Sequence, residues 1–539
     1  MATIRNPILP GFNPDPSICR VGEDYYIATS TFEWFPGVQI HHSRDLVHWR
    51  LITHPLDRLS QLDMTGNACS SGIWAPCLTY SDGLFWLLYT DVKCCEGAFK
   101  DTPNYLVTAP SITGPWSEPI YLNASGFDPS LLHDDDGRKW LVNQLWEFRK
   151  DRNRFAGVVL QEYSVAQRRL VGPVKNIFLG SALGTTEGPH LYKINGWYYL
   201  MTAEGGTGYG HAVTLARSRQ LEGPYEVGPR NPVLTSRDCP DAVLLRAGHG
   251  SIVQAGDGQW YMAHLCSRPV LVGDKPRCIL GRETAIQKVR WTADGWLELA
   301  DGGKSPKVEV EGPNLKEHPW PAEPTLDDFD GPKLSVHFAT LRLPAEESWL
   351  SLRQRPGWMR LFGRQSLTSR HRQSLVARRV QSLHCQATTC VEFDPEHFQQ
   401  MAGLVGIYNV RVWHYLAVTR DEKAGKCLHL FSCDNGKFEQ VLDTPISIEG
   451  WERVFLRARI EESKLTFFYA GGALPPGDKE SALDKLDWKP IAPALDASRL
   501  SDDYVQGPSF TGAFLGLCCQ DLSGMQKPAD FDFFQYKEM

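Results

Sequence analysis

Three carboxylic acids recur at the start of a repeated sequence pattern. Asp15 lies in Asn-Pro-Asp-Pro-Ser, Asp128 in Gly-Phe-Asp-Pro-Ser, and Glu187 in Thr-Glu-Gly-Pro-His. The pattern predicts one repeat position for all three, so that they face one another across a cavity. Hydrolysis of a glycosidic bond needs one protonated and one ionised carboxyl group, and a third acid nearby raises the pKa of the proton donor. The spacing therefore indicates acid–base chemistry.

Each acid also has a purely structural interpretation. Asp-Pro-Ser commonly opens a turn, so Asp15 and Asp128 could each serve the fold alone, and Glu187 before Gly-Pro could be a solvated loop acid. The shared repeat position favours the chemical interpretation, because three structural acids at that position would require three coincidences.

Five repeats must position these acids, and their lead residues recur every 54 to 62 positions. Each repeat has the pattern of a strand, a tight turn with glycine and an aromatic strand, which together form a hairpin. A second pattern is interleaved with the first, since residues 43–49, 111–116 and 218–225 resemble one another. Hairpins repeated radially make a β-propeller, and equivalent positions of its blades converge on the axis. We predict an all-β chain that begins with a five-bladed propeller.

The chain has 539 residues, which is too many for one core. We expect the propeller, as catalytic domain, at 1–311, a proline-rich linker at 312–325, and a β-sandwich of the jelly-roll or concanavalin-like type at 326–539. The sandwich is indicated by many short alternating strands separated by turns. Its last segment, 530–534, alternates acidic and aromatic residues, as a strand with one buried face does.

Composition excludes several classes of partner. A net charge of −7 gives no reason to expect nucleic acid or an anionic membrane surface. No apolar run approaches the roughly 20 residues that span a bilayer, and no signal peptide is visible before residue 11. The 14 cysteines lack metal-type spacing, which is typical of reduced thiols. We expect a cytoplasmic protein that binds neither nucleic acid nor membrane.

The three acid motifs resemble the catalytic motifs of glycoside hydrolase family 43. Four further stretches resemble the intracellular β-xylosidases of that family, which carry a β-sandwich after the propeller: 31–37, 73–76, 280–284 and 509–514. The resemblance covers essentially the whole chain. It implies an inverting exo-β-D-xylosidase that releases terminal xylose from xylobiose and longer xylo-oligosaccharides, with some α-L-arabinofuranosidase side activity.

The resemblance also implies a role for each acid. Asp15 would be the general base that activates water, and Glu187 would be the general acid. Asp128 would tune the pKa of Glu187 and help to orient it.

The resemblance also implies which residues would bind the substrate. Arg282 would hydrogen-bond the sugar hydroxyls, and Phe32 and Trp74 would wall the pocket for the terminal sugar. Phe510 would reach from the sandwich domain and close that pocket, which implies exo action. His249 resembles the family position that contacts a central cation or water.

Structural interpretations of these positions stay open. An isolated aromatic such as Trp74 is usually core in a propeller, and Arg282 could pair with Glu283 beside it. His249 could be a hydrogen-bonded core histidine, and a single histidine makes a weak metal site because Ca²⁺ takes six to eight oxygens. We expect no required cofactor, with Ca²⁺ or another divalent cation near the propeller axis as the one candidate.

Two departures and several rival functions remain. Cys77 stands where the family pattern suggests histidine, and residues 267–279 are shorter than expected for this branch. The rivals are an enzyme that acts mainly on α-L-arabinofuranosides and a non-catalytic sugar-binding propeller. A retaining enzyme related to invertases would carry an opening motif that this chain lacks. Relatives are often oligomers, so a homo-oligomer is expected by analogy.

Overall fold

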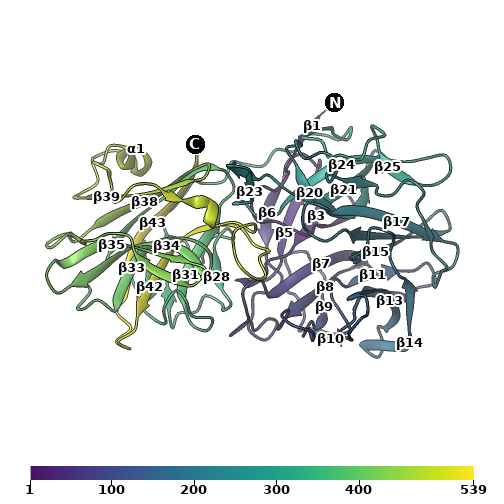
Figure 1. Ribbon diagram of the computed structural model, residues 1–539, viewed down its shortest axis with the longest axis horizontal. Helices are drawn as coiled ribbons and strands as arrows, with labels where there is room; N and C mark the ends of the chain where they lie inside the picture. The colour runs from purple at the N-terminus through teal and green to yellow at the C-terminus, as the bar shows by residue number, and fades with distance from the viewer. Residues whose placement is uncertain (1) are drawn as a thin grey trace. The chain divides into compact units, whose positions relative to one another are not determined.

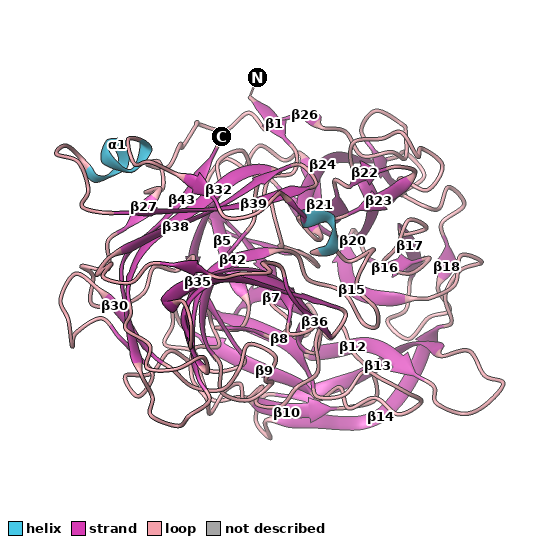
Figure 2. Ribbon diagram, turned by 60° about the vertical axis from the view of Figure 1, so that its left-hand side comes forward, coloured by secondary structure: helices cyan, strands magenta, loops and turns pink. Residues whose placement is uncertain are grey.

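The computed structural model describes residues 2–539, which are almost entirely β-structure. Figure 2 shows strands throughout, and the helical elements in the described part are α1 (Lys479–Asp484) and a 3-10 turn at Ala497–Arg499. The all-β prediction is confirmed. No helix in residues 2–539 has the length and apolar character needed to cross a membrane. The chain divides into two compact units, the first running to Arg268 and including Arg282–Trp320, the second comprising Pro269–Gly281 and Pro321–Met539.

The first unit contains five antiparallel sheets, each built on four strands in chain order (Figure 1), and confirms the predicted five-bladed propeller. The first two blades are β2 (Ser17–Val21), β3 (Asp24–Thr29), β5 (Gln39–Ser43) and β6 (Arg50–Thr53), then β7 (Gly72–Ser81), β8 (Leu84–Val92), β9 (Asn104–Ala109) and β10 (Ile120–Asn123). The third is β11 (Ser130–His133), β12 (Lys139–Trp146), β13 (Phe155–Ser164) and β14 (Arg169–Phe178). The last two are β15 (Glu187–Ile194), β16 (Trp197–Glu204), β17 (Ala212–Ser218) and β18 (Glu226–Val227), then β20 (Leu245–Gln254), β21 (Trp260–Ser267), β24 (Glu283–Trp291) and β25 (Leu297–Leu299).

The turn between the first two strands of each blade explains the glycine in every repeat. The five turn glycines all take a left-handed backbone, with φ between 63° and 86°. A residue with a Cβ atom is strained in that conformation, which is why the sequence signal was so regular. These positions are Gly22, Gly83, Gly137, Gly196 and Gly258.

The ring of blades closes through the N-terminal segment and the inner strands. Strand β1 (Thr3–Arg5) pairs with β26 (Glu309–Glu311), which follows the fifth blade. The Ser251 hydroxyl accepts a hydrogen bond from Ile18 N at 3.0 Å and donates to Pro16 O at 2.9 Å. The first and fifth blades are therefore held together directly beside the Asp15 motif.

The second unit is a sandwich of two antiparallel sheets around one apolar core, drawn in green and yellow in Figure 1. One sheet runs in the order β29 (Leu350–Ser351), β30 (Met359–Phe362), β43 (Pro528–Glu538), β32 (His384–Glu392), β38 (Val454–Glu461), β39 (Lys464–Gly471) and β40 (Lys489–Pro490). The other contains β36 (Lys437–Gln440), β35 (Gly425–Asp434), β34 (Val412–Asp421), β33 (Gln400–Asn409), β42 (Phe514–Asp521), β31 (Ser374–Arg379) and β28 (Ala339–Leu341).

Residues 269–279, most of the segment that is shorter than expected, belong to the second unit. They form a hairpin of β22 (Val270–Val272) and β23 (Lys275–Arg277) and then pack on the sandwich. Cys278 N donates to Asp503 Oδ2 at 2.8 Å, and Ala513 N donates to Ile279 O at 2.9 Å. Chain distant in sequence from the sandwich therefore completes that unit.

Asp530 of the sandwich is the centre of a buried ion network. Its two oxygens accept hydrogen bonds from Arg360 at 2.7 and 2.8 Å, and Arg355 donates to Oδ2 at 2.8 Å. We expect Asp530→Ala to lower the free energy of unfolding by about 3 kcal/mol, because Arg360 loses its carboxylate partner and Arg355 keeps only Glu392, at 2.7 Å. Urea denaturation measures this loss. The control is Asp487→Ala, whose side chain is 88% exposed; an equal effect of both changes would contradict the prediction.

Candidate active site

The chain bends at the lead motif of each propeller blade, within its first strand or just before it. Strand pairing skips residues between Trp74 and Cys77 in the second blade and between Glu187 and His190 in the fourth. One residue of each bend takes the left-handed conformation, with φ between 35° and 56°. Such bulges re-aim the neighbouring side chains, and non-glycine residues in this conformation are concentrated at functional sites. The five left-handed residues are Asp15, Ala75, Asp128, Gly188 and His249.

Glu187 does not occupy the repeat position predicted for it. Asp15 and Asp128 are themselves the left-handed residues of their bends, whereas in the fourth blade that residue is Gly188. Glu187 comes one position earlier and is equivalent to Trp74 of the second blade. The prediction of a shared position is therefore wrong for Glu187, because the sequence pattern does not reveal which residue of the motif makes the left-handed turn.

Asp15 is a buried carboxyl group with a polar partner on each oxygen. Arg282 Nη1 donates to Oδ1 at 2.9 Å, and Ser30 Oγ donates to Oδ2 at 2.7 Å. The side chains of Asp15 and Arg282 are 6% and 4% exposed, so this ion pair is shielded from water. An oxygen pair that only accepts hydrogen bonds, one of them from a guanidinium, suits an ionised carboxylate.

The surroundings of Glu187 favour its protonated form. Burial raises the pKa of Glu187 well above its usual value, and the charges of Asp128 and Asp15 raise it further, while Arg282 opposes them. The three acids are thus brought together, as the repeat predicted. In this cluster Glu187 has the environment of a proton donor at neutral pH.

Asp128 is linked to Glu187 through the backbone. Gly188 N donates to Asp128 Oδ2 at 2.9 Å, so the carboxylate contacts the peptide unit that follows Glu187. Burial raises the pKa of Asp128, the charge of Asp15 raises it further, and the Gly188 hydrogen bond opposes both. Asp128 and Glu187 therefore compete for ionisation within one buried volume, and their protonation is linked.

Aromatic rings lie next to this cluster. The Phe32 ring lies 6.0 Å from that of Trp74 and 5.8 Å from that of Phe12, and the Arg282 guanidinium sits over Phe32 at 5.3 Å. Trp74 is half-buried, and its Nε1 donates to Ser70 O at 2.9 Å. Rings fixed in this way present flat apolar surface of the kind on which a sugar can pack.

Arg282 pairs with Asp15, and its sequence neighbour Glu283 pairs elsewhere. Glu283 instead accepts two hydrogen bonds from Arg268, both at 2.7 Å. Arg282 Nη1 donates to the Thr207 hydroxyl at 3.0 Å as well as to Asp15. Thr207 lies in the glycine-rich run 205–210 between β16 and β17, outside the repeated motifs. The glycine-rich run and Ser30 were the sequence features that could have indicated the contacts of Thr207 with Arg282 and of Ser30 with Asp15.

His249 lies beside Asp15, with its Nδ1 3.7 Å from Asp15 Oδ1. Burial lowers the pKa of His249, although the charge of Asp15 opposes this shift, so the ring is neutral at neutral pH. Across residues 2–539 no group of three or more His, Cys, Asp and Glu side chains could hold a metal ion. The protein donors beside His249 therefore do not make a complete cation site, and the expected cation stays a prediction.

Phe510 belongs to the second unit and is half-buried there. The Ser509 hydroxyl donates to Asp502 O at 2.9 Å, and Thr511 N donates to the Tyr408 hydroxyl at 3.2 Å, so the backbone on both sides of Phe510 is anchored. Its role in closing the sugar pocket stays a prediction.

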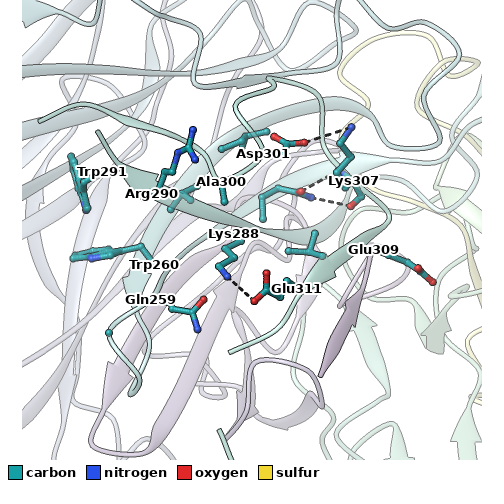
Figure 3. Close-up of a pocket in the computed structure, with 15 residues that line it drawn as sticks. Gln259, Trp260, Lys288, Arg290, Trp291, Ala300, Asp301, Lys307, Glu309 and Glu311 are labelled. Carbon is teal, nitrogen blue, oxygen red and sulfur yellow. Dashed lines mark hydrogen bonds and ion pairs between the residues drawn. The ribbon is translucent and has the colours of Figure 1, made fainter. Parts of the chain in front are cut away.

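A separate hollow of about 630 Å³ lies on the fifth blade (Figure 3). Trp260 and Trp291 line one end, and Lys288 pairs with Glu311 at 3.0 Å. The Trp291 ring packs on Tyr199 at 4.7 Å and on Trp260 at 5.8 Å, which is an ordinary core arrangement. None of the three acids lines this hollow, so it is distinct from the acid cluster.

Known proteins match both units. Residues 4–297 match the family described as Glycosyl hydrolases family 43, and residues 326–537 match the Beta xylosidase C-terminal Concanavalin A-like domain, which confirms the predicted sandwich type. A Bacillus subtilis (strain 168) protein named Beta-xylosidase is 54% identical over 544 residues, covering 99% of each chain. Xylosidase/arabinosidase 43B of Humicola insolens is 49% identical over 100% of this chain and 98% of its own. The crystal structure of xylan beta-1,4-xylosidase from Bacillus Halodurans C-125 is similar with a TM-score of 0.96 at 57% identity, covering 99% of this chain and 100% of the other.

Proposed function

Because the chain belongs to glycosyl hydrolases family 43, we propose that it is an inverting exo-β-D-xylosidase that releases terminal xylose from xylobiose and xylo-oligosaccharides. The chain is a glycoside hydrolase, and its relatives include proteins named Beta-xylosidase and xylan beta-1,4-xylosidase. One observation carries the proposal. A single cluster holds the buried Asp15, whose oxygens both accept hydrogen bonds, and the half-buried Glu187, whose pKa is raised.

In the proposed reaction Asp15 accepts a proton and Glu187 donates one. Asp15 takes a proton from a water molecule as that water forms a bond to the anomeric carbon. The glycosidic bond breaks on the opposite face of the sugar, and Glu187 gives its proton to the departing oxygen. Attack from the face opposite the leaving group converts a β-linkage into α-xylose. No cofactor takes part in these steps.

Asp128 is proposed to keep Glu187 protonated. We expect Asp128→Asn to move the upper limb of the kcat/KM pH profile to lower pH. The shift is toward lower pH because removal of the Asp128 carboxylate stabilises ionised Glu187 and lowers its pKa. Glu187 then loses its proton, and with it the ability to act as general acid, at a lower pH. Initial rates on xylobiose from acidic to alkaline pH measure the limb. An upper limb that stays in place would contradict the tuning role.

Arg282, Phe32 and Trp74 are proposed to bind the terminal sugar. Arg282 supplies a guanidinium group, which hydrogen-bonds hydroxyls, and the two rings supply the apolar wall. The exo mode, a homo-oligomeric assembly and a cytoplasmic location are further parts of the proposal. They rest on the family resemblance rather than on the acid cluster.

A second candidate function is hydrolysis of α-L-arabinofuranosides, either as a side activity or as the main one. The name of the Humicola insolens relative, Xylosidase/arabinosidase 43B, favours it. Both activities would use the same three acids, so the acid cluster does not separate them.

Purified protein tests the proposal when it is incubated in parallel with xylobiose, reducing-end-labelled xylotriose and nitrophenyl α-L-arabinofuranoside. We expect the largest kcat/KM on xylobiose, with xylotriose first giving unlabelled xylose and labelled xylobiose. A larger kcat/KM on the arabinofuranoside would establish the second candidate instead. Labelled xylose as the first product from xylotriose would contradict exo action from the non-reducing end.

A further inference from the structure

Glu204, the last residue of β16, is a fully buried carboxyl group outside the acid cluster. Its oxygens anchor the segment 179–186, here called the strap, which leads from β14 to Glu187. Ser181 N donates to Oε1 at 2.8 Å, and the Ser181 hydroxyl donates to Oε2. The Thr186 hydroxyl donates to Oε1 at 3.1 Å. Three donors from the two ends of the strap thus meet on one side chain.

The strap has little freedom to move while these bonds hold. Gly184 N donates to Ser181 O at 3.2 Å, and Gly205 N donates to Gly184 O at 2.9 Å. Gly180 is left-handed with φ 93°, and a Cβ atom there would lie 2.0 Å from the Thr186 hydroxyl oxygen. The strap is therefore packed tightly against Thr186, whose hydroxyl links it to Glu204.

Strand pairing places Glu204 next to the general acid. Glu187 is in register with Ala203, the residue before Glu204, and Thr186 is the residue before Glu187. The Thr186–Glu204 hydrogen bond consequently fixes the backbone immediately ahead of the Glu187 side chain from the neighbouring strand.

We propose that Glu204 is a positioning residue, which aims the Glu187 carboxyl group at the leaving-group oxygen by holding the strap. The inference rests on the proposed function of Glu187 as general acid. Proton donation depends steeply on placement, because an error of about 1 Å in a reacting group can cost about 10²-fold in rate. Release of the strap would therefore damage proton donation more than it damages sugar binding or water activation.

Leaving-group dependence separates this role from a merely structural one. Xylobiose needs a proton on its departing oxygen, whereas a dinitrophenolate leaves without one. We expect Glu204→Ala to lower kcat/KM on xylobiose by about 10²-fold and on dinitrophenyl β-D-xyloside by less than about 5-fold. The upper limb of the xylobiose pH profile should also move to lower pH, because a loosened strap admits water to Glu187 and lowers its pKa.

Two further variants make the test decisive. Glu204→Gln keeps the shape and one acceptor oxygen, so it should show the same substrate contrast with smaller losses, even where the alanine variant folds poorly. Asp45→Asn is the matched control, because Asp45 is 2% exposed and accepts hydrogen bonds from Val47 N at 2.9 Å and His48 N at 2.8 Å in another blade. It should leave the ratio of the two substrates unchanged.

The outcomes distinguish the inference from the proposed function. Equal losses on both substrates in both Glu204 variants would overturn the positioning role while leaving Glu187 as general acid. Wild-type protein without activity on either substrate would instead refute the proposed function. A contrast that appears in the Glu204 variants and is absent in Asp45→Asn would establish the positioning role.

Discussion

Glu187→Gln is expected to lower kcat on xylobiose by about 10³-fold, within the range that a general acid contributes. The amide keeps the size of the side chain but has no proton to give to the departing oxygen. On dinitrophenyl β-D-xyloside, whose leaving group needs no proton, the same variant should keep most of its activity. Steady-state rates on the two substrates measure the contrast.

The stability of Glu187→Gln supplies an independent check that the variant is folded. Burial raises the pKa of Glu187 above the value of about 4.3 that it has in the unfolded chain. Wild-type protein therefore loses stability relative to the variant as pH rises from about 4 toward the raised pKa, since ionised Glu187 is unfavourable inside the fold. We expect melting temperatures that agree near pH 4 and a higher value for the variant at alkaline pH. A variant equally impaired on both xylosides would contradict the role as acid.

Asp15→Ala is expected to lower kcat on both xylosides by about 10³- to 10⁴-fold, because water activation is needed whatever the leaving group is. This uniform loss distinguishes a base from an acid. Azide needs no deprotonation and fits the space that the carboxylate leaves. It should restore turnover of dinitrophenyl β-D-xyloside and form α-xylosyl azide by attack at the anomeric carbon.

The azide product is identified by its anomeric proton signal. Asp45→Asn is again the control and should retain full activity without azide. Formation of β-xylosyl azide would contradict the assignment of Asp15, because attack from that face would require a covalent intermediate on another residue. Unchanged kcat in Asp15→Ala would contradict the assignment outright.

Most of the fold follows from local sequence signals. The hairpin turns have a left-handed backbone that favours glycine, as at Gly22 and Gly83, so each hairpin could be recognised by a glycine in the sequence. The radial arrangement followed from the repetition itself. The division of the chain was harder to predict, because residues 269–281 lie within the propeller sequence yet pack in the second unit. Contacts such as that of Cys278 with Asp503 join positions too far apart for a single sequence to reveal.

The candidate site was predictable in its residue types and less so in its geometry. The repeat brought Asp15, Asp128 and Glu187 together, but it assigned Glu187 to the same position as the two aspartates. The one-residue offset depends on the turn at Gly188, where glycine takes the left-handed place that aspartate takes elsewhere. Glu187 therefore enters the cluster from a different backbone position than Asp15 and Asp128 do.

Partner choice among buried charges was also hidden in the sequence. Adjacent Arg282 and Glu283 suggested a pair, but Arg282 lies in the bend before β24 and Glu283 is the first residue of that strand. In the structure Arg282 forms an ion pair with Asp15, and Glu283 forms one with Arg268. Sequence adjacency was therefore a poor guide to ion pairing.

The most direct test of the central claim is proton NMR of xylobiose mixed with the protein and read within minutes. Our account, in which Asp15 activates water and Glu187 protonates the leaving group, predicts that α-xylose appears first and then equilibrates with the β-anomer. Early β-xylose would contradict it, because retention would require one of the acids to act as a nucleophile.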